Sequence, residues 1–274
     1  WNKQLFGEAG LHTEHGPKTL ADFEGYFRRL TRTTPEGTIT HLGAAPWDFY
    51  GNTNTLFTWG WIFGGSFYDE VSGKVTAAHP GNIRALEWVR SYYERYRSFS
   101  RRDFPTCNLA MRPAIARHLS QWTANFPDIP LGIGRMIVND DAGVANSEWL
   151  GGWTLGILRE SRQPDLAWQF TRFITASAEG TTAYAHASGC IPAYLRSRVF
   201  REISHDPHKA IYLDIAQSAT YIRPPMPAII DYFEELDSCM KDVLAGKIQP
   251  AAALEAVQER VQRKNDELVR TLSP

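Results

Sequence analysis

The side chains of this sequence that could do acid–base chemistry are poorly spaced for it. Pairs of adjacent carboxylates occur at residues 69–70, 140–141 and 234–235. A glycosidase needs two carboxylates held a defined distance apart across a sugar ring, whereas adjacent residues project from opposite sides of the backbone. The first two pairs are typical of turns and the third of a solvated helix face. Two distant carboxylates could still meet in the folded chain, so a glycoside-active enzyme remains an alternative, but we name no catalytic residue.

Motifs for metals, nucleotides and activated nucleophiles are also missing. The sequence has no GxSxG, no HExxH, no Walker loop and no GxGxxG after a strand. The close histidine pairs, at residues 12 and 15 and at 205 and 208, lie in polar segments without further ligands nearby. Cys107, Cys190 and Cys239 are far apart and odd in number, which predicts small core residues rather than a disulfide framework. We therefore predict no metal and no cofactor.

The aromatic residues are the most specific signal for binding. The chain has 9 Trp, 11 Tyr and 14 Phe, and several stand beside glycines in residues 47–65, namely Trp47, Tyr50, Trp59 and Trp61. The apolar face of a sugar ring stacks on such rings while its hydroxyls bond to polar groups at the rim. Any single tryptophan is more often a core anchor, but for the group we expect at least two to contact a ligand.

Length and charge set the broad class. The chain has 274 residues, and its 29 Lys+Arg against 30 Asp+Glu give a net charge of -1. This balance lacks the basic excess on which nucleic-acid binding relies, so nucleic acid is not an expected partner. The sequence has no stretch near the roughly 20 apolar residues that would cross a bilayer. We expect a globular chain with one large or two modest lobes.

Hydrophobic periodicity predicts mostly helices. Thr19 and Asp22 form a capping-box pattern at the start of the first helix. The predicted helices are 18–30, 81–98, 164–176, 178–187, 210–218, 230–245 and 250–272; the predicted strands are 108–111, 131–138 and 152–158. Residues 31–75 read as the least helical stretch and end in a hairpin at 67–75. The pattern indicates an α/β chain in which helices dominate.

Six segments in this order resemble those of extracellular solute-binding proteins that feed ABC importers, in the maltose-binding-like sugar group (family 1). The first is similar to that family's "YNKxLFxxAGL", and residues 151–157 are similar to its "GGWxLAI". The full set is 1–11 with 17–23, 61–65 with 69–76, 110–111 with 125–132, 151–157 with 165–170, 189–193, and 244–247 with 253–254. One departure is at 134–138, where the family's "aPLP" is replaced by Gly-Arg-Met-Ile-Val.

The resemblance implies a two-lobe, periplasmic-binding-protein-like fold (type II) that is helix-rich and has its first lobe incomplete, because the family's N-terminal portion has no counterpart here. Residues 1–147 would form the first part of the second lobe, 148–205 a return segment through the remnant of the first lobe, and 206–274 the C-terminal helices of the second lobe. Phe170, Phe173 and Ile174 would then lack their usual cover, and the exposed remnant could self-associate.

The resemblance also implies a function. The chain would be the substrate-binding component of an ABC import system, which captures a sugar or oligosaccharide between its lobes and delivers it to permease subunits. It would not be an enzyme, and it would act in the periplasm or outside the cell, anchored as a lipoprotein in a Gram-positive-type host. The ligand-binding residues would be Trp47, Tyr50, Trp59, Trp61, Gly152, Trp153, Arg223 and Phe233. With a shortened first lobe the chain alone should bind sugar poorly; the alternative is a truncated, self-associating structural fragment without a ligand.

Overall fold

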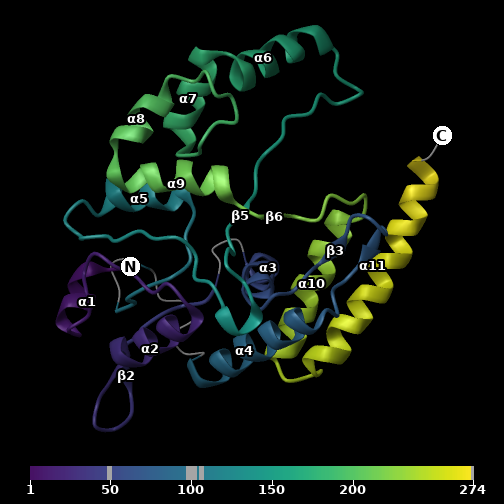
Figure 1. Cartoon of the computed structure of the whole chain (residues 1–274). Helices are drawn as coiled ribbons and strands as arrows, with labels where there is room; N and C mark the ends of the chain where they lie inside the picture. The colour runs from purple at the N-terminus through teal and green to yellow at the C-terminus, as the bar shows by residue number, and fades with distance from the viewer. Residues whose placement is uncertain (48–50, 97–103, 105–107, 273–274) are drawn as a thin grey trace.

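The computed structural model describes residues 1–47, 51–96, 104 and 108–272 and shows two units joined by a narrow junction (Figure 1). The larger unit contains the helices α1 (Lys3–Glu8), α2 (Leu20–Leu30), α3 (Asn52–Ile62), α4 (Pro80–Tyr96), α10 (Ile229–Leu244) and α11 (Pro250–Leu272). The smaller unit contains α6 (Pro164–Ala176), α7 (Ala178–Ser188), α8 (Val199–His205) and α9 (Pro207–Ser218), with α5 (Ala116–Asn125) beside α9. A short 3-10 helix, η2, spans Asp140–Ala142.

The described strands are short and pair only in twos. β1 (Arg32–Thr33) and β2 (Ile39–His41) are antiparallel, as are β3 (Tyr68–Asp69) and β4 (Lys74–Val75), which confirms the hairpin predicted at 67–75. β5 (Trp149–Leu150) runs parallel to β6 (Tyr221–Ile222) at the junction of the two units. The strands predicted at 108–111, 131–138 and 152–158 are wrong, because these segments make only isolated bridges, such as that between Leu42 and Leu109, or no ladder at all.

The core of the larger unit is built around α3, where the sequence predicted the least helical stretch. That prediction is wrong because α3 is buried on every side, mixes Thr and Asn with apolar residues, and so shows no amphipathic stripe. Every residue from Thr53 to Ile62 is buried, and α3 contacts both α4 and α10. Gly60 permits this packing, since a Cβ there would lie 2.5 Å from the Phe67 ring and 2.8 Å from Asn82 Oδ1. The tryptophans on either side of Gly60 are therefore part of a core helix.

The amphipathic helices lie where periodicity predicts them. Thr19 accepts the Asp22 N–H at 3.0 Å while the Asp22 carboxylate accepts the Thr19 N–H at 3.1 Å, so the capping box of α2 is present. α4, α6, α7, α10 and α11 match their predicted ranges within two residues, and α9 begins three residues earlier than predicted. Helices α1, α5 and α8 were not predicted; α1 and α8 are short, with 6 and 7 residues. Among the described residues, no helix combines the length and apolar character needed to cross a membrane.

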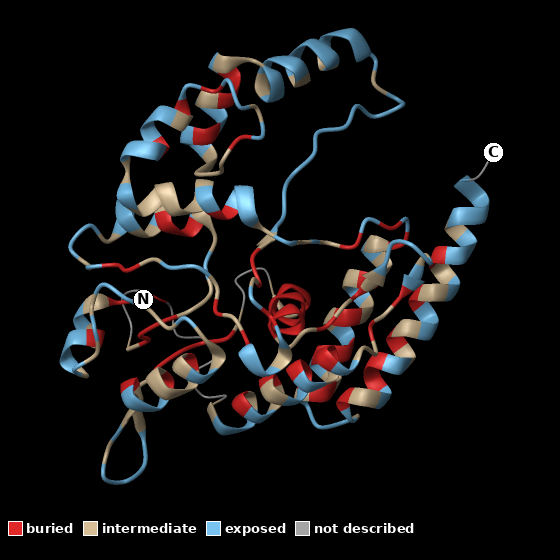
Figure 2. Cartoon of the chain, in the orientation of Figure 1, coloured by how far each residue is buried: buried red, intermediate tan, exposed pale blue. Residues whose placement is uncertain are grey.

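The smaller unit leaves apolar side chains in contact with solvent. Its own core is a small cluster of Ala185, Val199 and Ile203. Helix α6 has no buried residue, and its apolar side chains Leu166 and Phe170 are each 59% exposed. The segment 151–158 is exposed along its whole length, as the pale blue trace leading to α6 shows (Figure 2). The exposure that the resemblance implied is confirmed for Phe170 and Phe173, whereas Ile174 is half-buried.

Two glycine substitutions test the packing of α3. Gly60→Ala should lower the free energy of unfolding by about 1 to 3 kcal/mol, because the added methyl group overpacks a rigid core. Gly25→Ala in α2 is the matched control: nothing lies within 4 Å of its added Cβ, so the higher helix propensity of alanine should raise stability by up to about 1 kcal/mol. Urea unfolding measures both; equal effects would contradict the packing described for α3.

Candidate functional site

A cleft of about 1490 Å³ lies between the two units. The larger unit lines it with residues of α2, α3 and α10, and the smaller unit with residues of α6, α7 and α9. Residues 131–138 and 148–154, which belong to the segments that join the units, complete the wall. Because both units contribute, the width of the cleft depends on how the units are oriented at their junction.

A stacked group of side chains forms one part of the cleft wall. The guanidinium carbon of Arg223 lies 5.4 Å from the centre of the Trp149 ring and 5.5 Å from that of Phe233. Both distances are those of cation–π contacts. The Trp149 indole N–H donates to Thr58 Oγ1 at 3.1 Å, and Arg223 donates to Asn54 Oδ1 at 3.5 Å. This group, Asn54, Thr58, Trp149, Arg223 and Phe233, is called the aromatic wall below.

The backbone comes close to the aromatic wall at Gly151. A Cβ added to Gly151 would lie 3.2 Å from the Trp149 ring and 3.3 Å from the guanidinium carbon of Arg223, whereas a Cβ on Gly152 would meet nothing within 4 Å. Gly152 is exposed and lines the cleft beside Trp153, whose side chain is 76% exposed. The segment therefore presents unobstructed backbone next to a solvent-facing ring.

The structure separates the residues predicted to bind a ligand. Gly152, Trp153, Arg223 and Phe233 line the cleft. Trp59 also borders the cleft, but it is fully buried and its indole N–H donates to the Pro46 carbonyl at 2.8 Å.

Two of the remaining predicted residues lie in the larger unit, behind the cleft. Trp61 is buried and stacks on Tyr221 with 5.1 Å between ring centres. Trp47 is half-buried against Tyr92 and Tyr93. Tyr50 lies outside the described residues.

Sequence reasoning missed Asn54, Thr58, Trp149 and Glu148. Asn54 and Thr58 lie one turn apart on α3, and no polar periodicity marks them because all of α3 is buried. Trp149 lies two positions before the Gly-Gly-Trp segment that begins at Gly151, and Glu148 directly precedes Trp149. A charged residue at the start of an apolar segment that crosses between lobes was the available signal for Glu148.

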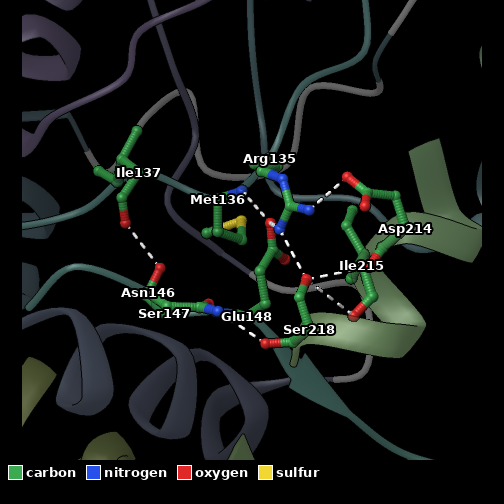
Figure 3. Close-up of polar contacts among 9 residues, drawn as sticks. All are labelled: Arg135, Met136, Ile137, Asn146, Ser147, Glu148, Asp214, Ile215 and Ser218. Atoms are coloured by element: carbon green, nitrogen blue, oxygen red, sulfur yellow. Dashed lines mark hydrogen bonds and ion pairs between the residues drawn. The ribbon is translucent and has the colours of Figure 1, made fainter. Parts of the chain in front are cut away.

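Glu148 is buried at the centre of a polar network where the units meet (Figure 3). Its carboxylate accepts the Met136 N–H at 2.9 Å and lies 4.0 Å from the Arg135 guanidinium. Arg135 also pairs with Asp214 and donates to Ser218 Oγ at 2.9 Å. Burial raises the pKa of Glu148, against the opposing effects of the Met136 N–H and Arg135. The network thus holds a carboxylate whose charge is costly at this position.

The described residues contain no group of three or more His, Cys, Asp or Glu side chains that could hold a metal ion. Cys239 is a buried free thiol, and burial raises its pKa to about 12, as expected of a core cysteine. Cys190 is a half-buried free thiol, and Cys107 lies outside the described residues. The groups that line the cleft include aromatic rings, amides and the guanidinium of Arg223, which suit the binding of a polar ligand.

No protein-family model matches the sequence. A probable amino-acid ABC transporter periplasmic-binding protein from Sinorhizobium fredii is 25% identical over 187 residues, which are 64% of this chain. The match spans 41% of the length of that relative.

Solved structures with this fold include solute-binding proteins. CpMnBP1 with mannotriose bound has a TM-score of 0.81 at 21% identity, covering 95% of this chain and 69% of that chain. An ABC transporter solute-binding protein from Thermotoga lettingae bound with α-D-tagatose has a TM-score of 0.73 at 20% identity, covering 96% and 68%. The maltose/maltodextrin-binding domain MalE from Bdellovibrio bacteriovorus, bound to maltotriose, has a TM-score of 0.71 at 17% identity, covering 96% and 69%. The chain has the two-lobed fold of these proteins.

Removal of the Glu148 charge should change how stability depends on pH. Because the folded pKa of Glu148 is raised, the folded protein keeps a proton that the unfolded chain releases at the ordinary carboxyl pKa. As pH rises from the ordinary carboxyl pKa to the folded pKa of Glu148, the free energy of unfolding of the wild type should therefore fall relative to that of Glu148→Gln. Above the folded pKa, the difference in unfolding free energy between the two proteins should level off. Urea unfolding at a series of pH values measures it. Glu255→Gln, on the exposed face of α11, controls for removal of one charge; a difference that grows in favour of wild type with rising pH would contradict the raised pKa.

Proposed function

We propose that this chain is the substrate-binding component of an ABC import system and that it captures a sugar or oligosaccharide in the cleft for delivery to permease subunits. The observation that carries the proposal is the aromatic wall, a stacked Trp149, Arg223 and Phe233 group at the cleft between the lobes of a solute-binding-protein fold. Rings beside amide and guanidinium donors are the combination that recognises a pyranose. We propose no catalytic role for the chain.

The proposed contacts divide between stacking and hydrogen bonding. Trp153 is the exposed ring of the cleft and would stack on the apolar face of a sugar. Phe233 and Trp149 would form a second platform deeper in the wall, with Asn54 bonding to hydroxyl groups. Gly152 leaves its backbone open to approach. Of the remaining sequence-predicted residues, Trp47, Trp59 and Trp61 would act from the layer behind these contacts, and Tyr50 lies outside the described residues.

Capture would work by closure of the two units. A ligand that touches both walls binds the closed arrangement better than the open one, and this differential affinity shifts the population toward closure. The closed form is then the state that permease subunits would recognise.

In this scheme the protein acts in the periplasm or outside the cell, anchored as a lipoprotein. Residues 148–205 form an incomplete first lobe. The second lobe consists of two parts, residues 1–147 and 206–274.

Titration calorimetry with mannotriose, maltotriose, tagatose and an amino-acid panel tests the ligand class. We expect saturable binding of a carbohydrate with a Kd on the order of 1 mM. Binding should be this weak because the proposed first lobe is incomplete, a proposal that the exposed α6 face supports. Trp153→Ala should weaken binding about three- to tenfold through loss of stacking. Trp168→Ala is the matched control, since Trp168 is 55% exposed but lies outside the cleft lining.

The outcomes separate the parts of this proposal. Binding of an amino acid in preference to every sugar would overturn the carbohydrate assignment. Micromolar binding of a sugar would leave the function standing and overturn the incomplete first lobe. A folded protein that binds nothing in the panel would favour a structural fragment without a ligand.

The exposed face of α6 should cause self-association. Leu166 and Phe170 lie one turn apart and are both largely exposed, so a second copy would bury them favourably. Light scattering at increasing protein concentration should show a mass above that of the 31.0 kDa monomer, and the double variant Leu166→Asp with Phe170→Asp should return it to the monomer. A monomer at every concentration would contradict this.

A further inference from the structure

The two units are connected through segments that meet at one place. Residues 135–138, 146–150 and 218–222, which we call the crossing segments, lie side by side at the junction (Figure 3). Ser147 Oγ donates to the Ile137 carbonyl at 2.6 Å, and Asn146 Nδ2 donates to the Ser218 carbonyl at 2.7 Å. These contacts tie the crossing segments to one another where the units meet.

Glu148 bonds to both of the other crossing segments. Its side chain accepts the Met136 N–H at 2.9 Å. Its backbone carbonyl accepts the Thr220 N–H at 3.0 Å and the Tyr221 N–H at 3.2 Å. One residue thus fixes the register of all three segments.

The charge of Glu148 has a separate role from its hydrogen bond. A glutamine amide oxygen could still accept the Met136 N–H, as a weaker bond to a neutral group but without the cost of a buried carboxylate. What glutamine lacks is the attraction for Arg135, which stands between Glu148 and Asp214 and donates to Ser218 on α9. The carboxylate therefore ties α9 of the smaller unit to the crossing segments through Arg135.

We propose that Glu148 is a positioning residue that sets how far the two walls of the cleft stand apart. Its neighbour Trp149 belongs to the aromatic wall, and the exposed Gly152 and Trp153 follow within five residues, so a shift at Glu148 moves the ligand contacts directly. The inference deepens the proposed capture of a carbohydrate and rests on it for its affinity readout, but the geometry at the junction can be measured without a ligand.

Two substitutions separate the charge from the hydrogen bond. Glu148→Gln should be at least as stable as wild type at neutral pH and yet bind mannotriose or maltotriose about tenfold more weakly, because fewer molecules hold the binding-competent orientation. Glu148→Ala should lose stability as well, with faster hydrogen exchange at the amides of Met136, Thr220 and Tyr221. Glu255→Gln, which changes an exposed glutamate in the second turn of α11, should behave as wild type in each measurement.

A purely structural role predicts a different result. If Glu148→Gln binds the sugar as wild type does, the positioning role is overturned. If wild type binds neither sugar, the proposed function fails on its own, and small-angle scattering decides the present inference: the radius of gyration should increase in both Glu148 variants and stay unchanged in Glu255→Gln. An unchanged radius in all variants would overturn it.

Discussion

The arrangement of the whole molecule depends on the parallel pairing of β5 with β6. Trp149 lies opposite Tyr221 and Leu150 opposite Ile222, so two passages of the chain between the units are held together over only two residue pairs. A ladder this short gives little stability alone. The hydrogen bonds of Glu148, Ser147 and Asn146 add the constraint that the ladder lacks. The walls of the cleft owe their positions to this one junction.

The rings near the junction connect the core to the cleft. Trp61 on α3 stacks on Tyr221 of β6 and contacts Trp149 of β5 with 5.6 Å between ring centres. Trp149 in turn faces Arg223 in the cleft wall. These rings form one continuous layer, whose inner rings are rigid because they are close-packed. Inner rings of this kind shape the site by holding the outer ones.

Sequence reasoning succeeded where local signals decide structure. The capping box at Thr19 and the apolar stripe of α11 predicted their helices closely, because each helix has one buried face and one solvated face. α3 failed because it is buried on all sides, and the strands failed because their partners are remote in sequence. For the site, the resemblance placed four cleft residues, but Glu148 depends on contacts between three distant segments, which no local pattern encodes.

The close pair of indoles in the core has an optical consequence. Trp59 and Trp88 lie with ring centres 4.2 Å apart and their planes inclined by 33°, beside the ring of Phe23. Two chromophores at this separation exchange excitation and give coupled bands of opposite sign in circular dichroism. Both rings sit in the larger unit, so this coupling reports the folding of that unit. The circular-dichroism signal of this indole pair can therefore distinguish unfolding of the larger unit from movement of the smaller one.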